Sequence, residues 1–242
     1  MTSAKVAVVA ALIIVAAAVV HAANSGKCGK DLQFEMNGTT LKITGTGPMY
    51  DADYFGGLPP WSEECKTVSH LDVGAGCTYI GKWMFANCSM DYVSISETVL
   101  EIGEYAFSHS AVMYFGTEKP SALEKIDNNA FEFCTNISGI SFPESVKFIG
   151  DYAFLNCTRL CTVLTDTATD PGLNSKHIFD NSCTYCHGLP ECTSLVCTRD
   201  DYKPSTFCGF ENIWTYTECG VSFLAPSLGI LTLLLILSSY LF

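Results

Sequence analysis

The stretch IGDYAFLNC, residues 149–157, decides the fold because close variants of it occur three more times in the chain. IGKWMFANC begins at Ile80, IGEYAFSHS at Ile102 and IDNNAFEFC at Ile126, so the intervals are 22, 24 and 23 residues. These stretches share the form I-G-x-x-A-F-x-x-C, and apolar residues at alternating positions follow each of them. A unit this short cannot bury both of its faces, so we expect successive units to stack and cover one another.

A period in the low twenties with this layout predicts a solenoid of the leucine-rich-repeat type. The alternating run after each turn predicts a short parallel strand, with a second short strand before the next turn and short helical turns between them. The sixth position of each turn should point into the stack. Phe85, Phe107, Phe131 and Phe154 are therefore expected to form one internal column.

Residues 137–157, ISGISFPESVKFIGDYAFLNC, resemble the BspA-like leucine-rich repeat family, whose units read L-x-x-I-x-I-P-x-S-V-x-x-I-G-x-x-A-F-x-x-C. The resemblance extends upstream, because residues 28–61 are similar to the capping segment that opens many family members. It covers roughly residues 28–165. Family members are surface proteins implicated in adhesion and host interaction, so the resemblance implies recognition and supplies no catalytic residues. The second repeat departs from the pattern, since Ser110 replaces the Cys and residues 116–125 carry an insertion.

Both ends of the chain have the layout of processing signals. Residues 1–22 read as a secretory signal, with Lys5 before an apolar run and small residues at the expected cleavage site. The last twenty residues are apolar and follow small residues, which is typical of a glycolipid (GPI) attachment signal with Gly220 as the attachment residue. A C-terminal membrane helix is the alternative, although the Lys or Arg that usually flanks such a span is absent.

We accordingly expect five segments. They are a signal peptide at 1–22, an N-terminal β cap at 23–65, the repeats at 66–165, a Cys-rich C-terminal cap at 166–219, and the attachment signal or hydrophobic tail at 220–242. The expected location is the cell surface, on the outer face of the plasma membrane, to which the lipid anchor or tail attaches the chain.

Thirteen cysteines in a secreted chain indicate an oxidising compartment and disulfides. Cys88, Cys134 and Cys157 occupy the ninth position of their repeats, where we expect buried free thiols that donate weakly to loop carbonyls. Ten cysteines remain, which allows five disulfides whose pairing the sequence leaves open. These disulfide candidates are Cys28, Cys65, Cys77, Cys161, Cys183, Cys186, Cys192, Cys197, Cys208 and Cys219.

The sequence favours a surface glycoprotein over an enzyme. Four N-x-S/T sequons begin at Asn37, Asn87, Asn136 and Asn156, and we expect Asn37 and Asn136 to be the better acceptors. The net charge of −12 disfavours nucleic acid as a partner. No catalytic constellation is apparent, and we expect no cofactor and no metal. CTYCH at 183–187 matches the C-x-x-C-H motif of a haem attachment site, but the surrounding cysteines favour disulfides.

Strand alternation indicates which residues would face solvent. The outward positions are small, neutral and rich in hydroxyls, which suits contact with an extracellular protein or glycan. The leading hypothesis is therefore adhesion or recognition, and the alternative is a structural coat glycoprotein without a specific ligand. The expected binding face consists of Tyr92, Ser94, Tyr114, Ser138, Ser141 and Thr162.

Overall fold

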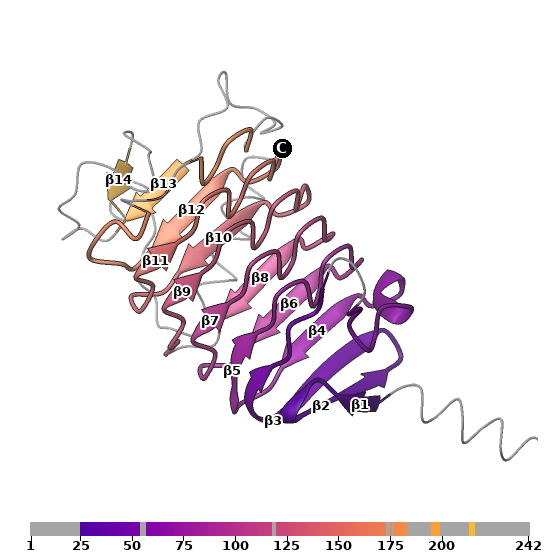
Figure 1. The fold of residues 1–242 in the computed structure, drawn as a ribbon. Coiled ribbons are helices and arrows are strands. Elements are labelled where there is room, and N and C mark those ends of the chain that lie inside the picture. Colours follow the sequence, from indigo (N-terminus) through magenta and orange to yellow (C-terminus); the bar gives the residue numbers. More distant parts are fainter. Residues whose placement is uncertain are drawn as a thin grey trace, which may run out of the picture.

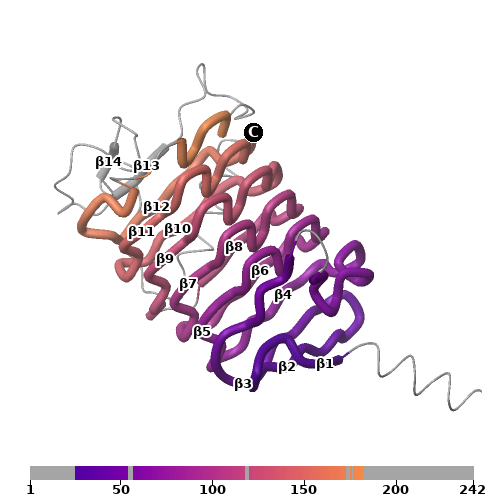
Figure 2. Tube along the Cα trace, in the orientation of Figure 1, coloured from indigo at the N-terminus to yellow at the C-terminus, as the bar shows by residue number. Residues whose placement is uncertain are grey.

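The repeated segments form the coils of a parallel β-solenoid, stacked one on the next along the length of the molecule (Figure 1). This computed structural model describes residues 25–53, 57–117, 120–172, 175 and 177–182, together with the backbone of 195–198 and 213–215. The expected signal peptide, the attachment signal with Gly220, and most of the Cys-rich segment lie outside the described residues. Figure 2 shows that the coils keep nearly the same shape along the stack.

Each coil contributes two parallel strands, a longer one and a shorter one. The longer strands are β4 (His70–Val73), β6 (Tyr92–Ile95), β8 (Tyr114–Thr117), β10 (Gly139–Phe142) and β12 (Thr162–Thr165). The shorter ones are β5 (Cys77–Ile80), β7 (Glu101–Ile102), β9 (Lys125–Ile126) and β11 (Phe148–Ile149). They lie side by side as β5, β7, β9 and β11 along the other edge of the stack. The predicted fold class is thus confirmed.

An antiparallel hairpin begins the stack. Strands β2 (Gly29–Asn37) and β3 (Thr40–Met49) pair along their length, and β1 (Ser25–Lys27) pairs with β2. The first half of β3 pairs with β4 and its second half with β5, so one strand supports both rows of the solenoid. A 3₁₀ helix, η1 (Glu64–Lys66), follows and precedes the first longer strand.

The aromatic column predicted from the sequence is present. Phe85, Phe107, Phe131 and Phe154 stack in order with ring centroids 5.3, 5.0 and 5.2 Å apart, and all four are fully buried. Trp61 closes the hairpin end of the column, stacking on Phe85 at 5.1 Å while its Nε1–H donates to the carbonyl of Met84. Each ring therefore covers the face that its neighbour would otherwise expose to water.

The turns differ from the short helices that the sequence predicted. In every turn the fourth and eighth residues have positive φ, as in Tyr105 (57°) and His109 (58°). This alternation aims the N–H groups of the fourth, sixth and eighth residues along the stack, toward carbonyls of the following coil. In the second turn the donors are Tyr105, Phe107 and His109, at N···O distances of 3.2, 2.8 and 2.7 Å. The turns are thus a third line of hydrogen bonds between coils.

From the second turn on, the ninth residue of the turn donates back to the coil before it. The Sγ of Cys134 lies 3.1 Å from the carbonyl oxygen of Phe107, and that of Cys157 lies 3.1 Å from the carbonyl oxygen of Phe131. These are the buried free thiols that were predicted. Ser110 makes the same bond to the carbonyl of Phe85, so replacing Cys by Ser leaves this position regular.

Several cysteines depart from the prediction. Cys88 is not a free thiol, because it is disulfide-bonded to Cys65 across a Cα–Cα distance of 4.6 Å. Its turn is the first, and the neighbour before it is the η1 segment, which supplies a second cysteine instead of a turn carbonyl. Cys28 and Cys77, predicted as disulfide candidates, are buried free thiols. Cys161 is disulfide-bonded, and the remaining candidates lie among the residues whose side chains are not described.

Burial makes these thiols unreactive. Removal from water raises the pKa of Cys134 and of Cys28 to about 12 and that of Cys77 to about 11, because the thiolate form loses its hydration. The pKa of Cys157 is raised for the same reason. Since a thiol reacts as the thiolate, these buried thiols are unreactive at neutral pH. Cys134 and Cys157 instead contribute hydrogen bonds between coils.

The row of longer strands is interrupted once. β4, β6 and β8 belong to one sheet, whereas β10 begins a second sheet with β12, β13 (Leu195–Thr198) and β14 (Ile213–Thr215). The insertion lies after β8, at this break, because nine residues stand between Gly116 and Ile126 where seven stand between Ser94 and Ile102. The side chain of Asn136 donates across the gap to the carbonyl of Ala111 at 3.4 Å. The aromatic column and the turn hydrogen bonds continue past this break.

The solenoid also continues past Thr165, where the sequence analysis ended the repeats. His177 and Asn181 have positive φ, as the fourth and eighth residues of a further turn do. Phe179 lies between them and stacks on Phe154 at 5.2 Å. Strand β13 then pairs in parallel with β12. Residues 177–182, HIFDNS, therefore belong to another coil.

Candidate interaction face

The candidate site is the solvent-facing side of the longer strands, which we call the outer face. It consists of the alternate residues of β4, β6, β8, β10 and β12 that point away from the aromatic column. On β4, β6, β10 and β12 the intervening residues are buried, as Val93 and Ile95 are on β6, whereas Phe115 and Thr117 of β8 are partly buried. The period-two geometry of the strands thus separates the core from this face.

A row of stacked aromatic rings crosses the outer face. Strand register places His70, Tyr92 and Tyr114 level with one another. The centroids of His70 and Tyr92 are 5.0 Å apart, and those of Tyr92 and Tyr114 are also 5.0 Å apart, with interplanar angles of 9° and 14°. Tyr92 is 47% exposed and Tyr114 is 37% exposed, so the row is a surface feature.

Two residues of this face had not been predicted from the sequence. His70 lies one repeat before Tyr92 and shares its position, but the stretch that precedes it has no I-G-x-x-A-F turn, so the first strand was not aligned with the others. Asp72 was missed for the same reason and lies 3.9 Å from Lys42 of β3 as an exposed ion pair. His70 and Asp72 lie 22 residues before Tyr92 and Ser94, and this spacing would have identified both of them.

The remaining predicted residues lie on the outer face with one exception. Ser94 and Ser141 are exposed, and Thr162 is half-buried on β12. Ser138 precedes β10 and its carbonyl accepts the N–H groups of Cys161 and Thr162. The residue that corresponds to Tyr114 on β10 is therefore Gly139, which is level with Thr162. The prediction for Ser138 was wrong by one residue. The strand β10 begins eight positions after Phe131, whereas β6 and β8 begin seven positions after the Phe of their turns.

The outer face carries little charge. Beyond the Lys42–Asp72 pair, the outward residues of β6, β8, β10 and β12 are aromatic, hydroxyl-bearing, aliphatic or Gly. Within the described part of the chain no group of His, Cys, Asp and Glu is arranged to hold a metal ion. In the same residues there is no helix with the length and apolarity to cross a membrane. The outer face therefore presents aromatic rings and hydroxyl groups, which are suited to non-covalent contacts.

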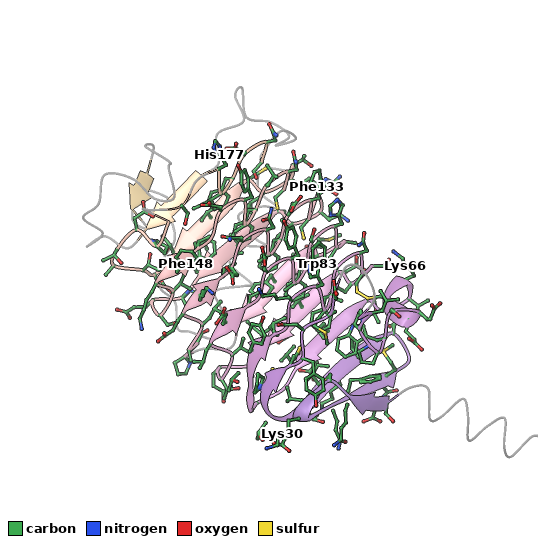
Figure 3. The ribbon with its side chains drawn as sticks, in the orientation of Figure 1. Lys30, Lys66, Trp83, Phe133, Phe148 and His177 are labelled. Atoms are coloured by element: carbon green, nitrogen blue, oxygen red, sulfur yellow. A yellow bond between two sulfur atoms is a disulfide. The ribbon has the colours of Figure 1, made fainter. Side chains whose placement is uncertain are left out.

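A second set of aromatic side chains lies on the turns. The positive-φ residues of neighbouring turns stack in pairs, with centroids 4.1 Å apart for Trp83 and Tyr105 and 4.5 Å apart for His109 and Phe133. Tyr152 and His177 form a third pair at 5.4 Å. Figure 3 labels Trp83, Phe133 and His177 from this set, and Phe148 from the row of shorter strands. At the other turns the corresponding positive-φ residue is Asn, so the aromatic pairs do not join into a continuous row.

Three of the four sequons lie in turns that lead into a longer strand, and the first lies at the end of β2 in the hairpin. Asn37 precedes β3, Asn87 precedes β6, Asn136 precedes β10 and Asn156 precedes β12. Asn37 and Asn87 are exposed, whereas Asn136 and Asn156 are half-buried. Because the amide nitrogen of Asn136 bonds to Ala111, attachment of a sugar there would break a contact between coils. The geometry favours Asn37 and Asn87 as acceptors, which differs from the sequence-based preference for Asn136.

Comparison with known proteins identifies the type of repeat. Six copies of the "BspA type Leucine rich repeat region" match residues 62–187, just over half of the chain. No curated protein sequence matches. A leucine-rich repeat protein of Eubacterium ventriosum has a similar crystal structure, with 20% sequence identity and a TM-score of 0.58 over 74% of this chain and 45% of that one. The pneumococcal vaccine antigen PcpA is similar at 15% identity and a TM-score of 0.41, over 73% of this chain and 52% of that one. The chain thus spans about half the length of these solved structures.

Proposed function

Because the chain belongs to the BspA-type leucine-rich repeat family, we propose that it is a cell-surface protein that recognises an extracellular protein or glycan. The outer face is the binding surface in this proposal, and the protein acts without catalysis. Repeat proteins commonly bind through an extended surface built from successive units, because the stacked coils hold the contact residues in fixed register. The acidic chain, with a net charge of −12, disfavours nucleic acid as the partner.

The observation that carries this proposal is the exposed aromatic row. Large aromatic side chains are mostly removed from water, and Tyr on a rigid scaffold gives much contact area for little loss of conformational entropy. Tyr92 and Tyr114 remain exposed while their strands are held by hydrogen bonds on both sides of β6. Such a rigid, exposed and amphipathic surface is typical of binding sites.

Two features of the sequence support a location at the cell surface. The secretory signal at 1–22 and the GPI signal at 220–242 would deliver the chain to the outer leaflet and retain it there. If the anchor is GPI, phosphatidylinositol-specific phospholipase C will release the protein from intact cells. If the protein stays bound to the cells after this treatment, the C-terminal membrane helix is favoured instead.

The test of recognition uses the full chain. The purified protein is screened on arrays of glycans and extracellular proteins, and each hit is remeasured with Tyr92, Tyr114 and Thr162 replaced together by Ala. We expect binding to fall at least tenfold, as it does when central aromatic residues of an interface are truncated. Tyr152→Ala is the matched control, because Tyr152 is also exposed (38%) but lies on a turn. If the triple variant binds as well as the parent chain, the outer face is not the site.

A structural coat protein is the second candidate, and the sequons favour it. Two of them, Asn37 at the end of β2 and Asn87 in the first turn, are exposed and would carry glycans on the surface of the first coils. A coat protein would be abundant, glycosylated and without hits on either array. Copy number per cell and the array results together distinguish it from a receptor or adhesin.

A further inference from the structure

The first sequon lies in line with the aromatic row of the outer face. Strands β2, β3, β4, β6 and β8 lie side by side in this order (Figure 1). Strand register places one residue of each strand at the same level. These residues are, in order, Asn37, Thr40, His70, Tyr92 and Tyr114.

The side chain of Asn37 points to the same side of the sheet as the exposed rings. On β2, Leu32 and Phe34 are buried and Met36 packs against the core, whereas Glu35 and Asn37 are exposed. Because side chains alternate along a strand, these exposed residues lie on the side of the outer face. A sugar attached to Asn37 would therefore begin on that side.

Asn37 can carry a sugar without a change in the fold. It ends β2, and Gly38 of the two-residue turn that follows has a positive φ of 60°. A Cβ placed on Gly38 would have no atom within 4 Å, so the turn projects from the hairpin. The side-chain amide of Asn37 makes no hydrogen bond to a described residue, whereas that of Asn136 bonds to Ala111. Attachment at Asn37 would thus break no hydrogen bond of the described fold.

Hydrogen bonds fix this turn relative to the row. The N–H groups of Ser69 and His70 both donate to the carbonyl of Thr39, at N···O distances of 2.9 and 3.2 Å. The Ser69 hydroxyl also bonds to the Thr39 hydroxyl at 2.8 Å and to Nδ1 of His70 at 2.9 Å. The acceptor turn therefore keeps a constant position relative to the first ring of the row.

The core sugars of an N-linked glycan are long enough to cover part of the row. Neighbouring strands are about 4.8 Å apart, so Tyr92 lies roughly 14 Å from Asn37 across three strand spacings. A pyranose ring is about as long as one such spacing. A glycan that follows the row from Asn37 would therefore cover His70 and Tyr92 before it reached Tyr114.

The exposed chemistry of the row suits contact with sugar. Tyr92 has a ring stacked on each face, so its ring edge and its hydroxyl are what it presents to a neighbour. Sugar C–H groups pack against aromatic carbon, and sugar hydroxyls exchange hydrogen bonds with the phenol hydroxyl. Lys42 and Asp72 flank the row with exposed charged groups that also bond hydroxyls. Removing aromatic surface from water favours the covered arrangement.

We propose that Asn37 carries an N-linked glycan whose core sugars lie over the aromatic row, covering Tyr92 most and Tyr114 less. The glycan is then a built-in cover of the outer face. In terms of the proposed function, it competes with a partner for the same rings, so the occupancy of Asn37 controls access to them.

The experiment measures the exposure of individual tyrosines and needs no ligand. The full chain is produced in eukaryotic cells that N-glycosylate, and peptide mapping establishes whether Asn37 is occupied. Tetranitromethane then nitrates exposed tyrosine rings, and mass spectrometry gives the rate at each site for the parent and for Asn37→Gln. We expect nitration of Tyr92 to rise about twofold or more in Asn37→Gln, because a bulky surface glycan no longer covers the ring. The rise should be smaller at Tyr114 and absent at Tyr152, which lies on a turn.

Ser89→Ala is the matched control, because it removes the sequon of Asn87 in the first turn and leaves Asn37 unchanged. It should not alter nitration of Tyr92. Enzymatic removal of N-glycans from the folded parent chain provides the same comparison if Asn37→Gln lowers the thermal midpoint.

Three results would overturn the inference: an unoccupied Asn37, equal nitration of Tyr92 with and without its glycan, or the same rise in Ser89→Ala. The proposed function is tested separately on the arrays. An array hit that requires Tyr92 should bind Asn37→Gln more tightly than the parent chain, which supports both ideas. The absence of any hit from either form would defeat the proposed function alone, since the nitration result does not depend on a partner.

Discussion

The inner column and the outer row are two stacks of aromatic rings with nearly the same spacing. Rings of the column are 5.0–5.3 Å apart, and those of the row are 5.0 Å apart. Both spacings follow from the distance between neighbouring strands, about 4.8 Å. A residue that recurs once per coil must stack on its counterpart whichever way it points.

The two stacks differ in burial and in continuity. Phe107 and Phe131 are fully buried and stack across the break between β8 and β10, whereas the outer row ends there at Tyr114. Covering a ring on both faces and removing it from water stabilises the fold. Leaving a row half exposed stabilises little and leaves aromatic surface in contact with water. The comparison teaches that stacking alone does not distinguish a core from a surface feature, and that exposure does.

The largest expected effect on stability comes from removing one ring of the inner aromatic column. Phe107→Ala removes a buried ring between two others, and we expect it to lower the free energy of unfolding by about 3–5 kcal/mol. Urea denaturation followed by circular dichroism measures the change. Phe107→Leu is the control and should lose clearly less, because it leaves a smaller cavity. A loss below about 1 kcal/mol for Phe107→Ala would contradict the column as the source of stability.

An intermediate effect is expected at the ninth turn position. Cys134→Ala removes one of the two hydrogen bonds to the buried carbonyl of Phe107, which keeps the N–H of Ser110 at 3.0 Å, so we expect a cost of about 0.5–1.5 kcal/mol. Cys134→Ser keeps a donor at the position where Ser110 already occupies the preceding turn, so it should lose much less. The same denaturation experiment compares them. Equal losses for Ser and Ala would show that the sulfur contributes through packing and not through the hydrogen bond.

The smallest effect on stability is expected on the outer row. Tyr92→Ala removes a partly exposed ring from between two others, and cross-strand aromatic contacts of this kind contribute roughly 0.2–1 kcal/mol. Tyr92→Phe keeps the stack and should be neutral in the same measurement. If Tyr92→Ala destabilised the protein as much as Phe107→Ala, the row would belong to the core and the difference between the two stacks would disappear.

Much of the fold followed from residue periodicity. The column of Phe residues, the strand after each turn and the buried thiols of Cys134 and Cys157 depend only on one coil repeating, so any single unit predicts the rest. Tyr92 and Tyr114 were found as outward residues for the same reason. His70 was not, because its coil has no turn of the repeated form before it and only its distance from Tyr92 marks it.

Other features depend on contacts between particular coils. Residue preference does not predict the left-handed conformation of Tyr105 and Phe133, since bulky side chains rarely have positive φ. They are held there by hydrogen bonds to the next coil. Likewise, the disulfide of Cys88 depends on η1 placing Cys65 beside it; the two residues are 23 apart, which is one repeat, but no turn of the repeated form marks the coil of Cys65.

By itself the sequence determined the repeat, the identity of the core residues and the neutral character of the outward positions, because these follow from local alternation and from identical units packing on one another. Only the tertiary structure decided where the aromatic row ends. Two inserted residues follow β8, where one sheet ends, and the next sheet begins with β10, whose first residue is Gly139 where β8 begins with Tyr114. That outcome depends on how two unlike coils meet, which no single repeat contains.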